Sequence, residues 1–368
     1  MSALTVLSLR LSQFRNHEAL ELGFDGRPVV ISGPNGAGKT NILEAVSLLS
    51  PGRGLRGAGA DEIARHPGTL GWKIAARVAG IGGSAQEVEI LSPPDGPRQL
   101  RIDGKAAPQL ALSAVVRVLW TVPAMDRLWA EGAEGRRRFI DRVALSFLPD
   151  HAQAALDYER AMRERNRLLR EALDDRRWFS ALEERMAEAA GALMRNRSKA
   201  LARLMEAQAA ASGRFPRADL AIRGPEGVAE AGAEALRAQW ELGRARDMAA
   251  GRTLAGPHRS DLHATLAGTG QAAARCSTGE QKALLISLIL ANARALRDEI
   301  GRAPVLLLDE VAAHLDPARR AALFDEIETL GAQALMTGTE ASLFGALVGR
   351  AQFMTPGRAG AAAEGAAS

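Results

Sequence analysis

The sequence contains one cysteine, Cys276, in 368 residues, which excludes an internal disulfide framework. It contains no uncharged apolar run of roughly 18 residues, so no segment is expected to span a membrane. The N-terminus also lacks a basic segment followed by an apolar one, and together these absences predict a cytoplasmic protein. Aromatic residues make up only 4% of the chain, with one tyrosine, which argues against grooves that stack nucleic-acid bases.

Lysine is also rare, so arginine carries nearly all of the positive charge. Residues 136–217 contain 18 Arg or Lys and 12 Asp or Glu, whereas the net charge of the whole chain is +4. A basic middle segment suggests a polyanionic partner. A codon bias toward arginine in an Ala- and Gly-rich chain explains the same numbers, so charge alone assigns no partner. The chain is long enough for about two globular domains.

A glycine-rich stretch at residues 33–40, GPNGAGKT, follows an apolar run at residues 29–31. It matches the phosphate loop, with two glycines separated by four residues and then Lys and Thr. The glycines allow successive backbone N–H groups to converge on phosphate oxygens, and the following helix directs its positive end at the same anion. We expect these residues to bind a nucleoside triphosphate: Gly33, Pro34, Asn35, Gly36, Ala37, Gly38, Lys39 and Thr40. Lys39 would reach the β- and γ-phosphates, and the Thr40 hydroxyl would ligate Mg²⁺.

A second motif completes this site near the other end of the chain. Residues 305–308 form an apolar run that predicts a strand buried in a parallel sheet, and Asp309 and Glu310 follow it. Asp309 would bind Mg²⁺, directly or through water, and Glu310 would orient and polarise the attacking water. The predicted catalytic residues are therefore Glu310, Lys39 and Asp309, with ATP and Mg²⁺ as cofactors.

Residues 277–281, STGEQ, lie upstream of that strand and resemble the signature motif of ABC-type ATPases. The resemblance implies that Ser277, Gly279 and Gln281 contact ATP held by another subunit. A serine at the start of a helix also serves as an N-cap, and the short motif alone fits either role.

The wide separation of Lys39 from Asp309 requires both chain ends to build one head. The expected fold is α/β, an ABC/SMC-like P-loop ATPase head with an inserted helical arm. The expected domains are residues 1–122 and 251–356 for the two parts of the head, 123–250 for the helical arm lobe and 357–368 for a disordered tail.

Periodicity predicts the elements within these domains. Strands are expected at residues 4–11, 19–24, 72–79, 86–91, 98–103 and 112–122. Helices are expected at residues 126–147, 149–177, 178–211 and 230–250, and from residue 278 to about residue 298. The stripe of apolar residues in 178–211 fits either a short coiled-coil seam or, as we favour, ordinary core packing.

These motifs and several others together resemble the bacterial RecF family over essentially the whole chain. The segments that carry the resemblance are Phe14-Arg15-Asn16, GPNGAGKT, residues 136–141 (RRRFID), residues 256–262 (GPHRSDL), the Ser277 signature and residues 306–323 (LLLDEVAAHLDPARRAAL). The resemblance implies an ATP-dependent homodimer that binds single-stranded or gapped duplex DNA. It further implies that RecO- and RecR-type mediators load recombinase with its help, with links to replication restart and the SOS response.

The resemblance extends to individual residues, for which simpler roles are also open. Arg15 is expected near the nucleotide, or it belongs to a turn at the end of a strand. Arg136, Arg137 and Arg138 are candidates for contacts with DNA phosphates, or they form a solvated helix face.

The sequence also departs from ABC-type ATPases. Residues 119–122 contain no glutamine where a Q-loop would supply one, and Thr337-Gly338-Thr339 stands where many such ATPases place a histidine. These departures fit a slow, DNA-stimulated ATPase. Two alternatives are a transport ATPase, which would have a much shorter insertion, and a structural SMC-like DNA clamp without productive hydrolysis.

Overall fold

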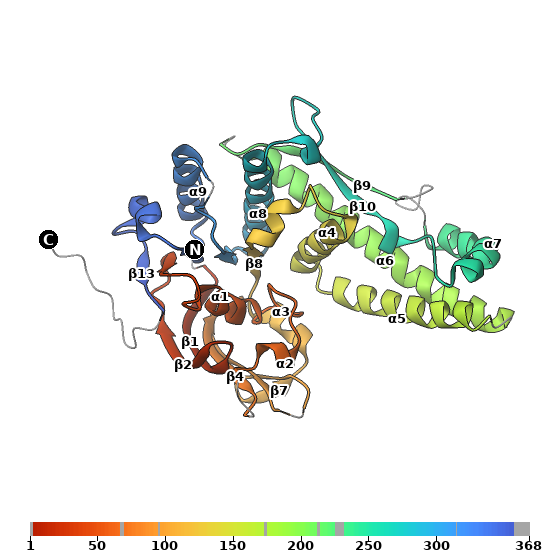
Figure 1. The fold of residues 1–368 in the computed structure, drawn as a ribbon, viewed down its shortest axis with the longest axis horizontal. Coiled ribbons are helices and arrows are strands. Elements are labelled where there is room, and N and C mark those ends of the chain that lie inside the picture. The colour runs from red at the N-terminus through yellow and green to blue at the C-terminus, as the bar shows by residue number, and fades with distance from the viewer. Residues whose placement is uncertain are drawn as a thin grey trace. The chain divides into compact units, whose positions relative to one another are not determined.

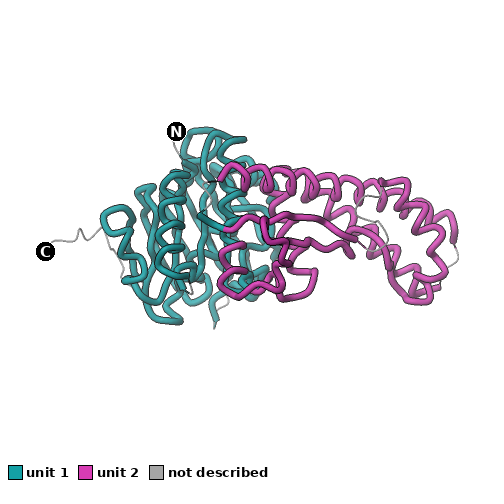
Figure 2. Tube along the Cα trace, turned by 90° about the horizontal axis from the view of Figure 1, so that it is seen from above, with its two compact units in different colours: residues 1–126, 212–215, 285–368 teal, residues 127–211, 216–284 magenta. Residues whose placement is uncertain are grey.

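The computed structural model describes residues 3–66, 70–94, 96–172, 175–211, 214–224, 232–313 and 315–356. The chain divides into two compact units, which we describe separately (Figure 2). Unit 1 comprises residues 1–126, 212–215 and 285–368, and unit 2 comprises residues 127–211 and 216–284. The expected tail, residues 357–368, lies outside the described residues. Within the described ranges, no helix is both long and apolar enough to cross a membrane.

A five-stranded parallel sheet in unit 1 takes its strands from both ends of the chain (Figure 1). Its strands, in the order β13-β3-β12-β11-β8, are β13 (Gln352–Met354), β3 (Val29–Ser32), β12 (Ala334–Gly338), β11 (Val305–Leu308) and β8 (Val118–Thr121). The three strands β8, β11 and β12 are buried at every residue, as parallel strands covered on both faces must be. The prediction of one α/β head built from both chain ends is confirmed.

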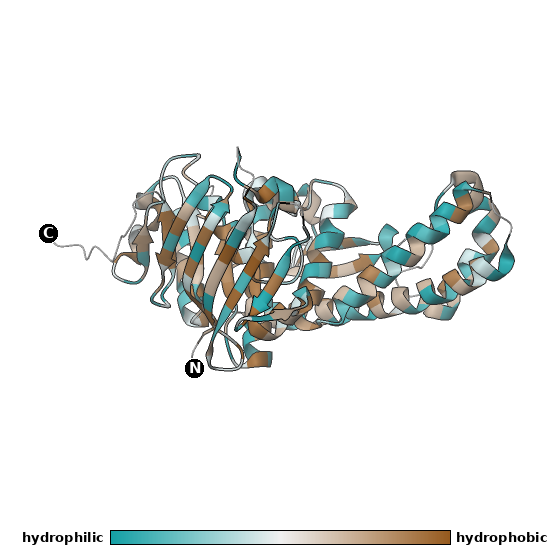
Figure 3. Cartoon of the chain, turned by 90° about the horizontal axis from the view of Figure 1, so that it is seen from below, coloured by the Kyte–Doolittle hydropathy of each residue, from teal (hydrophilic) through white to brown (hydrophobic). Residues whose placement is uncertain are grey.

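A six-stranded antiparallel sheet forms the second layer of unit 1. Its strands, in the order β2-β1-β4-β5-β6-β7, are β2 (His17–Gly23), β1 (Thr5–Phe14), β4 (Trp72–Ala79), β5 (Ala85–Ser92), β6 (Gln99–Ile102) and β7 (Lys105–Ala107). Buried and more exposed residues alternate along β4, and Figure 3 shows this alternation of hydrophobic and hydrophilic residues across the sheet. One face of the sheet therefore packs on the core.

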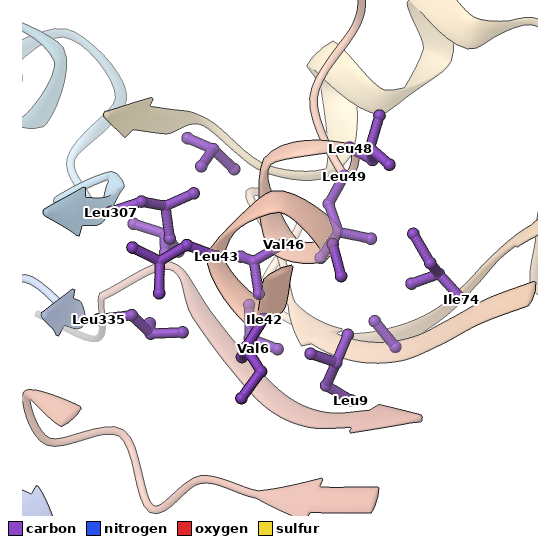
Figure 4. Close-up of a cluster of buried hydrophobic side chains, with 14 of the residues drawn as sticks. Val6, Leu9, Ile42, Leu43, Val46, Leu48, Leu49, Ile74, Leu307 and Leu335 are labelled. Carbon is purple, nitrogen blue, oxygen red and sulfur yellow. The ribbon is translucent and has the colours of Figure 1, made fainter. Parts of the chain in front are cut away.

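Helix α1 (Lys39–Ser47) lies between the two sheets and connects the phosphate loop to the core. Ile42 lies beside β1, and Leu43 faces Leu307 and Leu335 of the parallel sheet (Figure 4). Burial on both sides fixes the helix, and with it the loop that precedes it. The other helices of unit 1 are α2 (Ala60–Ile63), α3 (Leu112–Val115), α9 (Pro317–Leu330) and the 3₁₀ segments Gln109–Ala111 and Ala341–Leu347.

A buried amide joins the two sheets directly. Gln333 precedes β12 and is fully buried. Its Oε1 accepts a hydrogen bond from the Val6 backbone N–H at 2.8 Å, and its Nε2 donates to the Val6 carbonyl at 3.0 Å. The side chain thus satisfies both backbone groups of one residue in β1, beside a register shift between Val6 and Ser8.

Unit 2 is mainly helical. Its elements are α4 (Ala133–Phe147), α5 (His151–Arg170), α6 (Arg176–Ala209), α7 (Ala233–Ala250), the antiparallel strands β9 (Ala218–Arg223) and β10 (Asp261–Leu266), and the 3₁₀ segments Pro257–Arg259 and Ala273–Arg275. A 3₁₀ segment, Pro123–Arg127, spans the first division between the units, and α8 (Thr278–Ile300) spans the last. The predicted helices are thus present, and α5 packs on α6 as an antiparallel pair (Figure 1).

The core of unit 2 contains a fully buried ionic cluster. Arg165 of α5 is 0% exposed and donates to Glu183 at 3.1 Å and to Asp247 at 2.7 Å. It also donates to the Thr253 hydroxyl and the Trp240 carbonyl. Because these contacts join α5, α6 and α7, the cluster fixes how the three helices pack.

Two predictions of secondary structure are wrong in part. Residues 112–122 were predicted as one strand, but the chain forms α3 (Leu112–Val115) before β8 begins at Val118. A short apolar run has no periodicity that separates a buried helix from a buried strand. The turn between the first two strands is also shorter than predicted: β1 extends to Phe14 and β2 begins at His17, so only Arg15 and Asn16 connect them.

Candidate nucleotide-binding site

The phosphate loop connects β3 to α1, at the carboxyl edge of the parallel sheet. Gly38 is the N-cap residue of α1 and has φ of 88°, in the left-handed region that favours glycine. A Cβ atom at Gly38 would lie 2.5 Å from His17 Nε2 and 2.7 Å from Asn16 Oδ1. Glycine is therefore required here both for its backbone conformation and for the close approach of the β1–β2 turn.

Lys39 lies at the centre of this loop and is 5% exposed. Its Nζ donates to the carbonyls of Gly33 at 2.6 Å and Pro34 at 2.9 Å. The ammonium group is thus held against the loop backbone, next to the positive end of α1. An anion bound by the loop N–H groups would be close to this charge.

Asp309 and Glu310, the acids that follow β11, are called the Walker B acids here. Asp309 lies next to the phosphate loop. Thr40 Oγ1 donates to Asp309 Oδ1 at 2.9 Å, with Oδ2 at 3.1 Å. Both residues follow strands of one parallel sheet, whose carboxyl ends share an edge, so two segments far apart in sequence meet there. A threonine hydroxyl and a carboxylate are ligands that suit Mg²⁺.

The protein side chains alone do not make a complete metal site. In the described parts of the chain, no group of three or more His, Cys, Asp or Glu side chains could hold a metal ion. Mg²⁺ usually keeps several waters and takes further oxygens from substrate phosphates. Thr40 and Asp309 fit that pattern, because they offer two oxygens at one end of the loop.

Glu310 follows Asp309 and has a left-handed backbone, with φ of 50°. It lines a cavity of about 290 Å³ together with the phosphate loop. The full lining is Asn16, Asn35, Gly36, Ala37, Gly38, Lys39, Thr40, Asn41, Arg56 and Glu310. The structure therefore places the predicted catalytic glutamate and the predicted phosphate-binding residues around one cavity.

Arg15 is not among the residues that line this cavity. Its Nε and Nη2 donate to the two oxygens of Glu44 at 2.8 and 2.6 Å. Glu44 lies on α1 and is fully buried, and it also accepts from Arg56 at 2.9 Å. Arg15 thus stabilises a buried carboxylate beneath the loop, which would be costly without paired cations.

Three residues of the cavity were missed by the sequence analysis. Asn16 donates to the Gly36 carbonyl at 3.2 Å and accepts from Asn41 at 2.6 Å, and Arg56 donates to Asn41 Oδ1 at 2.7 Å. Asn16 lies within the Phe14-Arg15-Asn16 segment, but only Arg15 was assigned a role. Asparagine in a two-residue turn between strands is itself a signal for a tight hairpin, which brings Asn16 to the loop.

His17 also contacts the phosphate loop, with Nε2 at 3.3 Å from the Gly38 carbonyl. Burial lowers the pKa of His17 below its usual value, and the hydrogen bond to Gly38 opposes this shift in part. Burial of the ring thus favours its neutral form.

The signature residues Ser277, Gly279 and Gln281 lie in unit 2, at the start of α8. Ser277 is exposed, and its hydroxyl donates to Glu280 Oε2 at 2.7 Å while accepting from the Glu280 N–H at 3.3 Å. Gln281 is buried and donates to the Cys276 carbonyl at 2.9 Å. Ser277 therefore precedes the first residue of α8 and caps this helix through Glu280. It is also exposed to solvent.

The arginine run lies on α4 in unit 2, and its members differ. Arg136 donates to both oxygens of Asp261 at 2.7 and 2.9 Å and to the carbonyls of Leu128 and Glu131. Arg137 donates to the Ser260 carbonyl at 2.9 Å. Arg138 has a side chain that is 71% exposed, and its Nη1 lies 3.2 Å from Oε1 of the equally exposed Glu134, one turn earlier in α4. The structure thus holds Arg136 within the fold and leaves Arg138 on the surface.

The GPHRSDL segment anchors unit 2. His258 Nδ1 lies 2.6 Å from the Tyr158 hydroxyl, and burial lowers the pKa of His258 to about 4. Arg197 donates to the Pro257 carbonyl at 2.9 Å, to Ser260 Oγ at 2.8 Å and to both oxygens of Asp141. The segment therefore links α5, α6 and β10.

Comparison with known families identifies a match over most of the chain. Residues 5–347 match the model of the RecF/RecN/SMC N-terminal domain. The DNA replication and repair protein RecF of Mesorhizobium japonicum is 47% identical over 371 residues, covering 96% of this chain and 97% of that protein. RecF of Rhizobium meliloti is 48% identical, covering 94% and 95%.

Solved structures show the same fold at lower identity. The recombination mediator protein RecF-ATPrS in the RecFOR pathway aligns with a TM-score of 0.82 and 23% identity, covering 93% of this chain and 94% of that chain. The Smc head domain of Pyrococcus furiosus, with an extended coiled coil, aligns with a TM-score of 0.51 and 16% identity, covering 93% and 91%. The likeness confirms the predicted ABC/SMC-like head.

Proposed function

We propose, on the premise that this chain belongs to the RecF family of DNA replication and repair proteins, that it is an ATP-gated DNA-binding protein of recombinational repair. It binds ATP with Mg²⁺ and forms a homodimer in the ATP-bound state. Slow hydrolysis of ATP then opens the homodimer. One observation carries the proposal: Thr40 and Asp309 are 2.9 Å apart, beside a cavity lined by the phosphate loop and Glu310.

The phosphate loop and the two acids after β11 have distinct roles in this proposal. The N–H groups of the loop and the Lys39 ammonium bind the phosphates, and Thr40 and Asp309 hold Mg²⁺. The metal supplies charge stabilisation for phosphoryl transfer. Glu310 accepts a hydrogen bond from the attacking water and takes its proton as the water oxygen bonds to the γ-phosphorus. The bond between that phosphorus and the bridging oxygen breaks at the same time, and ADP leaves with this oxygen.

The position of the signature residues supports the proposed dimer. Ser277 is exposed at the start of α8, so its hydroxyl and the neighbouring N–H groups can meet an anion from a second copy. ATP bound in one copy would then join the two copies and stabilise the dimer by mass action. Whether the protein is a monomer or a dimer would then depend on whether ATP is bound.

DNA binding in the dimer is assigned to exposed arginines of unit 2. Arg138 is the member of the α4 run that lies open to solvent, and it can neutralise a DNA phosphate. The low aromatic content favours contacts with the backbone of single-stranded or gapped duplex DNA over base stacking. A related structure is described as a recombination mediator in the RecFOR pathway, so RecR- and RecO-type proteins are the proposed partners.

The experiment that tests this proposal is DNA binding across a salt series, with and without ATP and Mg²⁺. We expect affinity to fall steeply with salt in the presence of ATP and to be weak at every salt concentration without it. Equal affinity with and without ATP would contradict gating.

A structural clamp that binds ATP without productive hydrolysis makes a different prediction. In a clamp, Glu310→Gln would leave the lifetime of the DNA complex unchanged, whereas in a switch it would trap the ATP-bound dimer on DNA. The Glu310 side chain at the cavity favours the switch.

A further inference from the structure

Thr337 lies at the carboxyl end of β12, and its side chain is fully buried. Its hydroxyl makes two hydrogen bonds. Oγ1 donates to Asp309 Oδ1 at 2.6 Å and accepts from the Glu310 backbone N–H at 2.9 Å. One hydroxyl therefore connects the proposed metal ligand to the backbone of the proposed catalytic glutamate.

The strand register explains this placement. β12 lies between β3 and β11, with Met336 level with Leu308 of β11 and Gly338 level with Ser32 of β3. Thr337 is one residue beyond Met336, so it is level with Asp309, the first residue after β11. The side chain thus lies between the strand that leads to the phosphate loop and the strand that ends in the Walker B acids.

The backbone at Glu310 needs such support. Its φ of 50° is uncommon for a residue other than glycine, and left-handed backbone at such residues costs of order 1–3 kcal/mol. The Thr337 hydroxyl binds the N–H of this residue, at the point where the chain turns out of the sheet. The turn directs the Glu310 side chain to the cavity.

The same hydroxyl also restricts Asp309. Oδ1 accepts from Thr337 and Thr40, so the carboxylate is held by one residue of β12 and one residue of α1. A hydrogen bond that orients a metal-binding carboxylate typically changes metal affinity or activity by about 10–100-fold. A valine of the same shape in place of Thr337 would leave one acceptor and one donor without this partner.

We infer that Thr337 is a positioning residue for ATP hydrolysis, which sets the orientation of Asp309 for Mg²⁺ and of Glu310 for water. This inference rests on the proposed function. Thr337 transfers no proton in this role, because its hydroxyl hydrogen stays on the bond to Asp309. Thr337 belongs to the segment Thr337-Gly338-Thr339, which stands where many ABC-type ATPases have a histidine, and it acts through Asp309 and Glu310.

Two measurements on Thr337→Val test the inference. The first is the affinity for a fluorescent ATP analogue with Mg²⁺ and with EDTA. We expect Thr337→Val to keep the affinity in EDTA and to lose about tenfold or more of the gain that Mg²⁺ gives the unsubstituted protein. The second is steady-state hydrolysis at saturating ATP and Mg²⁺, for which kcat should fall by about 10–100-fold, while KM for ATP rises by no more than the affinity measured with Mg²⁺ falls.

Two further variants separate positioning from packing. Thr337→Ser keeps the hydroxyl and should restore most of both losses. Thr5→Val is a matched control, because Thr5 is a buried strand threonine in β1 whose hydroxyl donates to Ala3, away from the cavity. If Thr337→Val retains the Mg²⁺ gain and kcat, or if Thr337→Ser is as impaired as Thr337→Val, the inference is wrong. If the unsubstituted protein itself binds no ATP analogue, the proposed function fails instead.

Discussion

The phosphate loop of unit 1 and the arginine run of α4 both gather hydrogen-bond donors that suit phosphate, but they use different groups. The loop uses backbone N–H groups and one lysine held against the loop carbonyls. The run uses three guanidinium groups, of which Arg136 binds Asp261 and two carbonyls while Arg138 stays exposed. In both regions donors bond to the protein itself, but Lys39 bonds to carbonyls of its own loop, whereas Arg136 bonds to Asp261, which is distant in sequence.

The role of the phosphate loop is easier to predict than the roles of the arginines, because the loop's groups are close together in sequence. The groups that shape the loop lie within eight consecutive residues. The partner of Arg136 lies 125 positions away in β10, where no local pattern indicates it. Variants in the loop and in the arginine run test whether the two regions have these different roles.

The largest effect is expected at the loop. Lys39→Ala removes the charge that would face the β- and γ-phosphates, and hydrogen bonds to charged groups contribute about 1.5–3 kcal/mol each. We expect ATP affinity to fall about 100-fold, measured by calorimetry or with a fluorescent ATP analogue. Lys105→Ala, in exposed β7, is the control that should bind normally. Lys39→Ala binding within about threefold of the unsubstituted protein would refute the role of the loop.

An intermediate effect is expected at Arg136. The side chain is 13% exposed, and its partner Asp261 is 24% exposed. Arg136→Gln breaks a largely buried ion pair and two bonds to carbonyls, so we expect the free energy of unfolding to fall by about 2–3 kcal/mol, while ATP affinity stays the same. Chemical denaturation followed by circular dichroism measures the change. Unchanged stability together with weaker DNA binding would show that Arg136 faces DNA instead.

The smallest effect on stability is expected at Arg138. An exposed ion pair four residues apart on a helix contributes about 0.3–0.5 kcal/mol, so Arg138→Gln should lower the free energy of unfolding by no more than about 0.5 kcal/mol. If Arg138 neutralises one phosphate, the slope of log affinity against log salt should become shallower by about 0.9. DNA titrations at several salt concentrations measure this slope. An unaltered slope would remove Arg138 from the DNA-binding surface.

The elements that the sequence predicts well are those with strong local patterns. The α/β head, the strands around the loop, the antiparallel strands of residues 72–102 and the long helices are all present. Residues 112–122 failed because an apolar run fits α3 as well as β8. The strands of the first hairpin were also predicted too short. Asn16 and His17 were therefore not placed at the tight turn that contacts the phosphate loop.

The remaining site contacts depend on partners that are distant in sequence. Thr337 was noticed only as part of the segment Thr337-Gly338-Thr339, which stands where many ABC-type ATPases place a histidine, and its bond to Asp309 spans 28 positions. Glu44 looked like an ordinary residue of the first helix, yet it is fully buried between Arg15 and Arg56. Both sets of contacts join residues from different elements. The spacing of residues within one helix or strand therefore does not predict them.

The central claim is that ATP joins two copies of this protein and thereby controls its hold on DNA. The most direct test is the mass of Glu310→Gln in solution, measured by light scattering with saturating ATP, Mg²⁺ and DNA. The account predicts a dimer on DNA with ATP and a monomer without nucleotide. A mass that stays that of one chain under both conditions would contradict it.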